Sequence, residues 1–151
     1  MVEQSLEGGC LCGRVRYQID RYTGPVSHCH CRHCQRSSAA AFVTWVELNA
    51  EDFSWTGVTP AEDRRPSDTT SEAIRTFCVA CGSSLTYARI GKDWLAVTVS
   101  SLDDPEAVKP EMHVYACREL SWAKLHDGLP RHDQLPPAHS AADPTAVRSC
   151  S

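Results

Sequence analysis

The strongest constraint on this chain is the placement of its cysteines. The 151 residues contain nine, and seven of them form three short clusters: Cys10 and Cys12, then Cys29, Cys31 and Cys34, then Cys78 and Cys81. The first residues lack the apolar run of an export signal, so we expect a cytoplasmic protein whose thiols stay reduced. Reduced cysteines clustered in this way are typical of metal ligands, with a dithiol redox switch as another interpretation.

The first and last clusters share a local pattern. They read GGCLCG over residues 8–13 and FCVACG over residues 77–82, and each ends in a glycine, Gly13 or Gly82. A tight turn that aims backbone N–H groups at sulfur often requires a positive φ, which glycine adopts freely. Two such turns facing each other would supply the four thiolates of a closed, structural zinc site. The alternative is buried free cysteines on two hairpins.

The middle cluster has a different pattern, HCHCRHCQRSS over residues 28–38. It places three thiolates on one short segment, and Gln35 rather than glycine follows the last of them. Three protein ligands with one open position are typical of a catalytic zinc. The position could also be closed by one of four residues, His28, His30, His33 or Cys117.

Spacing alone leaves a second partition of the cysteines open. Cys31 and Cys34 could join Cys78 and Cys81 in a zinc ribbon of the CxxC…CxxC type, with Cys10, Cys12 and Cys29 left over. The matching glycines favour the pairing of the first and last clusters instead.

Short strand patterns recur along the chain and predict a mainly β fold with little helix. Val15, Tyr17 and Ile19 alternate with polar residues, and similar patterns occur at 42–47, 53–56, 73–77, 84–88, 94–100 and 113–116. Weak helical patterns occur at 32–40 and 121–126. The polar segment 57–71 contains two prolines and is interpreted as a loop. The four tryptophans are expected to pack in or beside the core, and Cys117 to be a small buried apolar residue.

Length and charge limit the class of protein. A chain of 151 residues fits one domain, which we expect over residues 1–132, followed by a mobile tail over 133–151 that is rich in proline. The formal charge of −4 argues against a partner that is a nucleic acid or a membrane surface. No apolar run approaches the ~18 residues of a membrane-spanning helix.

The cysteine motifs, with VTVSSLDDPEAVKP at 97–110 and HVYACRELSWAKLHDGLP at 113–130, resemble those of the glutathione-dependent formaldehyde-activating enzyme family. That family includes the centromere protein V type of domain, and the resemblance covers about residues 7–132. It implies a β-tent of small antiparallel sheets and two zinc ions per chain. The implied ligands are Cys10, Cys12, Cys78 and Cys81 for a structural zinc, and Cys29, Cys31 and Cys34 for a catalytic zinc. One departure is that the family often has glycine where Ala39 or Ala40 stands here.

The resemblance implies a carbon–sulfur lyase of the S-(hydroxymethyl)glutathione synthase type. Such an enzyme reversibly adds glutathione, or a related thiol, to formaldehyde or a related aldehyde. A free thiol with a pKa near 8.5 is only about 3% thiolate at pH 7, and zinc deprotonates a thiol that it binds. A carbonyl held near the same metal would also be polarised.

Because both the protein and glutathione are negatively charged, binding would need a local cationic pocket. Arg32 and Arg36, beside the middle cluster, are the candidates for it. The alternative function is a non-catalytic zinc-binding interaction module of the same fold.

Overall fold

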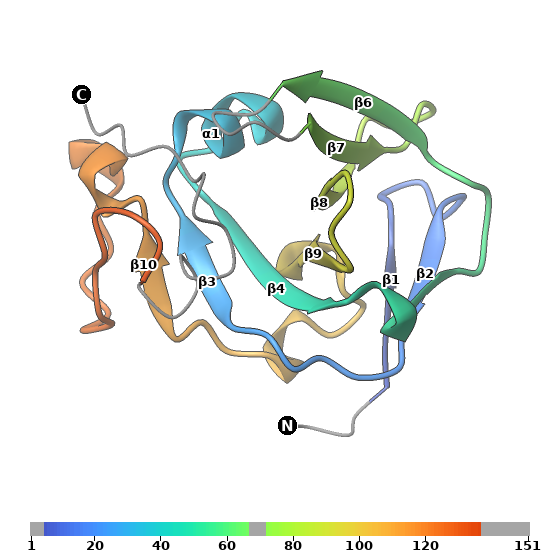
Figure 1. The fold of residues 1–151 in the computed structure, drawn as a ribbon, viewed down its shortest axis with the longest axis horizontal. Helices are drawn as coiled ribbons and strands as arrows, with labels where there is room; N and C mark the ends of the chain where they lie inside the picture. Colours follow the sequence, from blue (N-terminus) through green and yellow to red (C-terminus); the bar gives the residue numbers. More distant parts are fainter. Residues whose placement is uncertain (1–4, 67–71, 137–151) are drawn as a thin grey trace.

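The computed structural model describes residues 5–66 and 72–136, which form two β-sheets and one short α-helix (Figure 1). The smaller sheet has the order β1-β2-β5, with bounds Leu6–Gly9, Arg16–Ile19 and Phe53–Trp55. The larger has the order β10-β3-β4-β9-β8-β7-β6. Its strands, in that order, are Met112–Val114, Val26–Cys29, Val43–Asn49, Trp94–Thr98, Ser84–Arg89, Glu72–Phe77 and Ala61–Pro66. The mainly β expectation is confirmed.

The pairings are antiparallel except for one. β10 runs parallel to β3, with His113 opposite His28 and Val114 opposite Cys29. The helix α1 spans Arg32–Ser38, within the range that the sequence predicted. Five 3₁₀-helices complete the described structure: η1 (Ala50–Asp52), η2 (Val99–Ser101), η3 (Pro105–Ala107), η4 (Ala116–Arg118) and η5 (Ser121–Ala123). None of the helices in the described ranges has the length and apolar character that crossing a membrane requires.

The interpretation of residues 57–71 as a loop is wrong for Ala61–Pro66, which forms β6 and pairs with β7 along its whole length. β6 is an edge strand with alternating charges, and its side chains pair along the strand, Glu62 with Arg64 and Asp63 with Arg65. An edge strand can carry charge on both faces, so it needs no apolar alternation. Residues 67–71 lie outside the described residues.

The two faces of β4 belong to two apolar clusters. Val46 and Leu48 point into the main core, which they share with residues of the smaller sheet such as Tyr17 and Ile19. The opposite face of β4 contributes Val43 and Trp45 to a second cluster, whose other buried members are Cys29, Cys34, Ala96 and Val114. The alternation of side chains along β4 therefore places Val43 and Trp45, with Cys29 and Cys34, on one side of the larger sheet. The main core lies on the other side.

Helix α1 begins and ends on unusual residues. Cys31 is its N-cap, and the sulfur accepts a hydrogen bond from the backbone N–H of Cys34 at 3.3 Å. The helix ends on Ala39, which adopts the left-handed conformation with φ of 55°. Such a conformation costs about 1 kcal/mol for an L-residue and nothing for glycine. A glycine at residue 39, one of the two positions where the resemblance implies it, would adopt this conformation without strain.

The predicted tail is only partly within the described residues. Leu135 packs against the second apolar cluster, whereas residues 137–151 lie outside the described ranges. The division of the chain at residue 132 stays a prediction.

The β1–β2 hairpin is fixed against the segment that follows β9. The Tyr17 hydroxyl lies 2.7 Å from Ser101 Oγ, and the backbone N–H of Asp103 donates to Glu7 at 2.9 Å. Gly8 lies between these contacts, and a Cβ there would come within 2.3 Å of Tyr17 Oη and 2.5 Å of the Ser101 carbonyl oxygen. The close approach requires glycine, and it positions the turn that carries Cys10 and Cys12.

We therefore expect Gly8→Ala to lower the free energy of unfolding by about 1–3 kcal/mol, because the added methyl group overpacks a site bounded by backbone. Glu7→Ala, at the exposed neighbouring position, should change it by less than about 0.5 kcal/mol. Thermal or urea unfolding of the two variants measures the difference. Equal stabilities would show that the hairpin can shift to accommodate a side chain at residue 8.

Candidate metal centre

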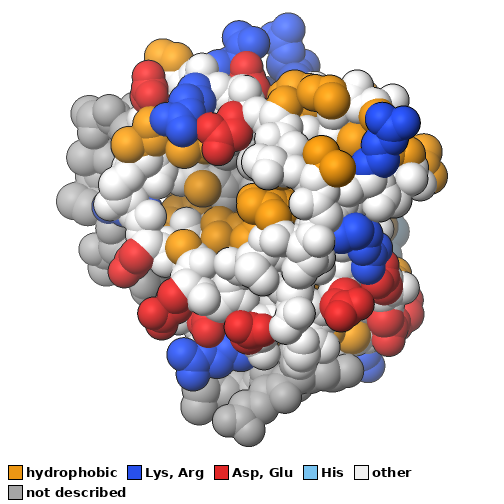
Figure 2. Space-filling view, turned by 90° about the vertical axis from the view of Figure 1, so that its right-hand side faces the viewer, with side chains coloured by type: hydrophobic (Ala, Val, Ile, Leu, Met, Phe, Trp, Pro, Cys, Tyr) orange, Lys and Arg blue, Asp and Glu red, His pale blue; other side chains and the backbone are white. Residues whose placement is uncertain are grey.

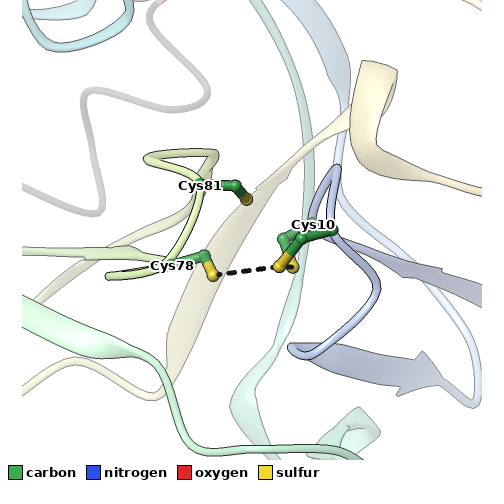
Figure 3. A group of neighbouring side chains, drawn as sticks. Cys10, Cys78 and Cys81 are labelled. Atoms are coloured by element: carbon green, nitrogen blue, oxygen red, sulfur yellow. Dashed lines mark hydrogen bonds between the residues drawn. The ribbon is translucent and has the colours of Figure 1, made fainter.

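Four cysteines from distant parts of the sequence come together between the two sheets. The sulfurs of Cys10, Cys12, Cys78 and Cys81 all lie within 4.8 Å of one another. The Sγ–Sγ distance is 3.5 Å from Cys10 to Cys12 and 3.8 Å from Cys12 to Cys78. Figure 3 shows Cys78 and Cys81 facing Cys10 across this group. Zinc–sulfur bonds of about 2.3 Å in a tetrahedron place sulfurs about 3.8 Å apart, so the group fits a zinc ion.

The two turns that carry these cysteines are built alike. Gly13 N–H donates to the Cys10 carbonyl at 3.0 Å, and Gly82 N–H donates to that of Cys78 at 2.7 Å. Both glycines have positive φ, 78° and 76°, which confirms the prediction from the sequence. A further N–H, that of Val15, donates to the Cys10 sulfur at 3.3 Å. Backbone donors directed at sulfur favour its thiolate form, which is the form that binds metal.

The remaining clustered cysteines form a second group at the end of β3. The sulfurs of Cys29, Cys31 and Cys34 lie within 4.8 Å of one another, and no other His, Cys, Asp or Glu of the described residues joins them. The structure thus places Cys31 and Cys34 with Cys29, rather than with Cys78 and Cys81 as a zinc ribbon would require. The Cys34 sulfur lies 3.5 Å from that of Cys29 and accepts a hydrogen bond from Trp45 Nε1 at 3.4 Å.

Crowding of the three sulfurs has an electrostatic consequence. The neighbouring Cys29 and Cys34 side chains lower the pKa of Cys31 to about 2, and hydrogen bonding with Cys31 raises the pKa of Cys29 well above its usual value. One thiolate is therefore stabilised at the expense of the others, because adjacent like charges repel. A divalent cation would remove this repulsion, so the donor set fits a metal ion.

Aromatic side chains surround the three-cysteine group, and the sequence did not identify this arrangement. The Tyr87 ring lies 6.2 Å from that of Trp45 and 6.0 Å from that of Trp94, and Tyr115 packs against the same cluster. Burial raises the pKa of Tyr115, and electrostatic interaction with Cys29 and Cys31 raises it further. Trp45 and Trp94 pack as expected, but Trp122 is 77% exposed, so the packing expectation is wrong for that residue.

The cations beside these aromatic rings differ from those that the sequence suggested. Arg75 Cζ lies 4.9 Å from the centre of the Tyr87 ring, and its Nε is buried with no hydrogen-bond partner among the described residues. Arg89 Nε donates to the Tyr87 hydroxyl at 3.0 Å. By contrast, Arg32 donates to Gln35 Oε1, and both Arg32 and Arg36 are exposed. The contact of Arg75 with Tyr87 depends on the register of β7 against β8, in which the two residues are paired. The sequence alone does not predict this register.

The histidines near the middle cluster do not join its sulfurs. His28 Nδ1 lies 2.8 Å from Thr44 Oγ1, and His30 Nε2 lies 2.8 Å from His113 Nδ1. Burial lowers the pKa of His28 to about 4 and also lowers that of His30, so both are neutral at pH 7. Cys117 is exposed and lies outside the three-cysteine group, which contradicts the expectation that it is buried.

A hollow of about 850 Å³ opens beside the four-cysteine group, with Gly9, Cys10, Ser83 and Ser101 in its wall. Ser38 and Val43 line its other side, and both contact the three-cysteine group: Ser38 Oγ donates to the Cys34 carbonyl at 2.7 Å, and Val43 shares the second apolar cluster. Figure 2 shows a hollow with apolar side chains on its floor and charged side chains of both signs around it. The hollow thus adjoins both cysteine groups.

Comparisons with known proteins identify the family of the chain and a solved structure with a similar fold. The model of the glutathione-dependent formaldehyde-activating enzyme family matches residues 5–118. A search of curated proteins finds no match. Among solved structures, a crystal structure of a Rhodobacter sphaeroides protein, a structural-genomics target, shares the fold with a TM-score of 0.53 at 18% identity, over 83% of this chain and 98% of that one. Because the family model covers more than half of the sequence, the chain belongs to the glutathione-dependent formaldehyde-activating enzyme family.

Proposed function

We propose that the protein is a zinc-dependent carbon–sulfur lyase that reversibly adds glutathione, or a related thiol, to formaldehyde or a related aldehyde. The observation that carries the proposal is the three-cysteine group, in which Cys29, Cys31 and Cys34 meet without a fourth ligand from the described residues. Three protein ligands leave one position for a substrate. Family membership supports formaldehyde activation in general, and the open position supports a thiol as the group that enters.

Two zinc ions per chain have different roles in this proposal. Cys10, Cys12, Cys78 and Cys81 hold a structural ion, since four thiolates close its coordination. Cys29, Cys31 and Cys34 hold the catalytic ion, which when bound supplies a Lewis acid and lowers the pKa of a coordinated thiol.

The chain's own residues hold the three-cysteine group rigid. The backbone N–H of Cys34 fixes the Cys31 sulfur, and Trp45 Nε1 fixes the Cys34 sulfur. Cys29 is the last residue of β3 and is paired with Val43 on β4. Since all three sulfurs are positioned by regular structure or by an N–H donor, the site is organised before substrate arrives. Cys31 is the most exposed of the three, which places the open side of the group next to it.

We propose that Arg75 and Arg89 attract the carboxylates of the thiol. The protein carries a formal charge of −4, so long-range attraction does not favour an anionic substrate. Arg75 stacks on Tyr87, whose ring lies beside Trp45, the residue that contacts Cys34. Its unpartnered Nε leaves a donor for a carboxylate, and arginine binds carboxylates with paired, charge-assisted hydrogen bonds.

A non-catalytic zinc-binding module is the second candidate function. It is favoured by the burial of two of the three sulfurs, since Cys29 and Cys34 are each only 7% exposed. In that case the second zinc would stabilise the end of β3 without taking up a substrate. The activity measurement below distinguishes the two functions.

The first prediction concerns the two metal sites. In purified protein the two cysteine groups should hold up to two zinc ions per chain, and Cys34→Ala should fold with one fewer ion bound by cysteine. Cys78→Ala removes a ligand that lies in the main core, and because metal binding there is coupled to folding, it should give insoluble or unfolded protein. Metal analysis and thermal unfolding measure both effects. Equal loss of stability in the two variants would contradict the division into structural and catalytic sites.

The second prediction is the activity. Glutathione and formaldehyde combine spontaneously, so the quantity to measure is the exchange rate between free formaldehyde and its glutathione adduct at equilibrium, by NMR exchange spectroscopy. The protein should accelerate exchange and Cys34→Ala should not, whereas Lys124→Ala, at an exposed position outside both cysteine groups, should behave as the native protein. If exchange is not accelerated and the zinc absorption edge shows no added sulfur ligand with glutathione, the non-catalytic module is the better interpretation.

The third prediction tests the cationic contact. Arg75→Gln should raise the KM for glutathione about tenfold, because one charge-assisted hydrogen bond is lost, while kcat changes little. A neutral thiol such as 2-mercaptoethanol should be almost unaffected. Arg65→Gln is the matched control, since Arg65 is an exposed arginine on the neighbouring strand β6 that pairs with Asp63. The same KM in both variants would exclude Arg75 from substrate binding.

A further inference from the structure

A second group of metal-binding side chains lies behind the three-cysteine group. In the pairing of β3 with β4 and β10, Cys29 aligns with Val43 and Val114, and His28 aligns with Thr44 and His113. Consecutive residues of a strand point to opposite faces. His28 and His113 therefore lie on the face opposite to Cys29. Asp127, from the segment after η5, closes over them.

Three ligand atoms converge on this face. His113 Nε2 lies 2.9 Å from Asp127 Oδ2 and 3.1 Å from Oδ1, and His28 Nε2 lies 4.0 Å from Oδ2. All three ligand atoms are within 4.8 Å of one another. Ligands at about 2.1 Å from a metal, at right angles, are about 3 Å apart, and ligands at wider angles are about 3.4–4 Å apart. The separations suit a single metal ion held between the three side chains.

The other ring nitrogen of each histidine already has a partner. His28 Nδ1 lies 2.8 Å from Thr44 Oγ1, and His113 Nδ1 lies 2.8 Å from His30 Nε2. Histidines that bind metals typically use the second nitrogen in this way, since the hydrogen bond fixes both the ring orientation and the tautomer. Both histidines thus present Nε2 to the Asp127 carboxylate, with their rings held in place.

The Asp127 carboxylate has no arginine or lysine paired with it among the described residues. Its two oxygens lie 2.9 and 3.1 Å from His113 Nε2, and the nearby Arg131 is bound to Glu119 instead. A cation held between the carboxylate and the two imidazoles would balance the negative charge of Asp127.

We propose that His28 Nε2, His113 Nε2 and the Asp127 carboxylate bind a third metal ion, a divalent transition metal. Two imidazoles and one carboxylate suit zinc, cobalt, nickel or ferrous iron, whereas magnesium and calcium prefer ligand sets made of oxygen alone. The Asp127 side chain is 28% exposed and that of His113 is 0% exposed, so the ion enters from the Asp127 side, where water completes its coordination.

Metal binding requires the ring protons of His113 and His30 to change position, but it releases no proton. Without metal, His113 Nε2–H donates to Asp127, and His30 Nε2–H donates to His113 Nδ1. With metal, His113 uses the Nε2 lone pair, its proton is on Nδ1 and donates to His30 Nε2, and the His30 proton is on Nδ1. The two tautomers change together, and the number of bound protons is the same in both states.

Cobalt uptake by the zinc-loaded protein tests the proposal. The protein is first loaded with two equivalents of zinc per chain, which fill the two thiolate groups, and free zinc is removed. It should then bind one additional equivalent of Co²⁺ and keep its zinc. The added cobalt should show no thiolate-to-metal charge-transfer absorption, because no sulfur is a ligand. His28→Ala and Asp127→Asn should each weaken this uptake by at least about tenfold.

Two controls separate metal binding from folding. Asp127→Asn retains an oxygen that can accept the hydrogen bond from His113, so its thermal unfolding should remain close to that of the native protein. His126→Ala removes an exposed histidine next to Asp127 that is not part of the group and should leave cobalt uptake unchanged. The proposal is wrong if the native protein takes up no additional cobalt, or if both ligand variants bind it as the native protein does. Since cobalt uptake is measured without thiol or aldehyde, its result does not depend on the lyase activity.

Discussion

The contact between the two cysteine turns is the constraint on which the rest of the structure depends. One turn belongs to the β1–β2 hairpin of the smaller sheet, and the other joins β7 to β8 in the larger sheet. Their four sulfurs meet at the edge of the main core, and Leu11 N–H donates across the junction to Ser83 Oγ at 3.0 Å. If the sulfurs did not meet, the sheets would be joined mainly by apolar packing and by the contacts of Tyr17 with Ser101 and of Glu7 and Arg16 with Asp103. The orientation of the smaller sheet relative to the larger one is therefore coupled to metal binding by these four cysteines.

A single stretch of alternating residues separates two kinds of ligand. In His28, Cys29, His30 and Cys31, histidine and cysteine follow one another, and the two-residue period of β3 directs the first pair to opposite faces of the sheet. Cys29 thus joins the thiol side with Cys34, whereas His28 joins His113. The pairing of β3 with β4 sets the position of both residues, because it places Cys29 opposite Val43 and His28 opposite Thr44. A shift of the β3–β4 register by one residue would exchange the two faces and remove both groups, so this register is strongly specified.

The sequence predicted features that follow from local rules. Glycines after the cysteine motifs predicted positive φ at Gly13 and Gly82, and alternating apolar residues predicted β2 and β4. It did not predict β6, because charge pairing on an edge strand leaves no apolar period. It also missed the contact of Arg75 with Tyr87 and that of His113 with Asp127. These contacts depend on strand register and on a chain reversal after η5, which single-sequence patterns do not encode.

In the proposed zinc-bound state, the number of thiolates explains how cysteine serves both a structural and a catalytic zinc site. Four thiolates around a divalent ion give a formal charge of 4 × (−1) + 2 = −2, and all positions are filled. Three thiolates give 3 × (−1) + 2 = −1, so that ion is the stronger Lewis acid and can accept one more anion. The added thiolate would return the charge to −2. The proposed cationic residues Arg75 and Arg89, two aromatic rings away from Cys34, would offset that charge. At the four-cysteine group the backbone N–H of Val15 donates directly to the Cys10 sulfur.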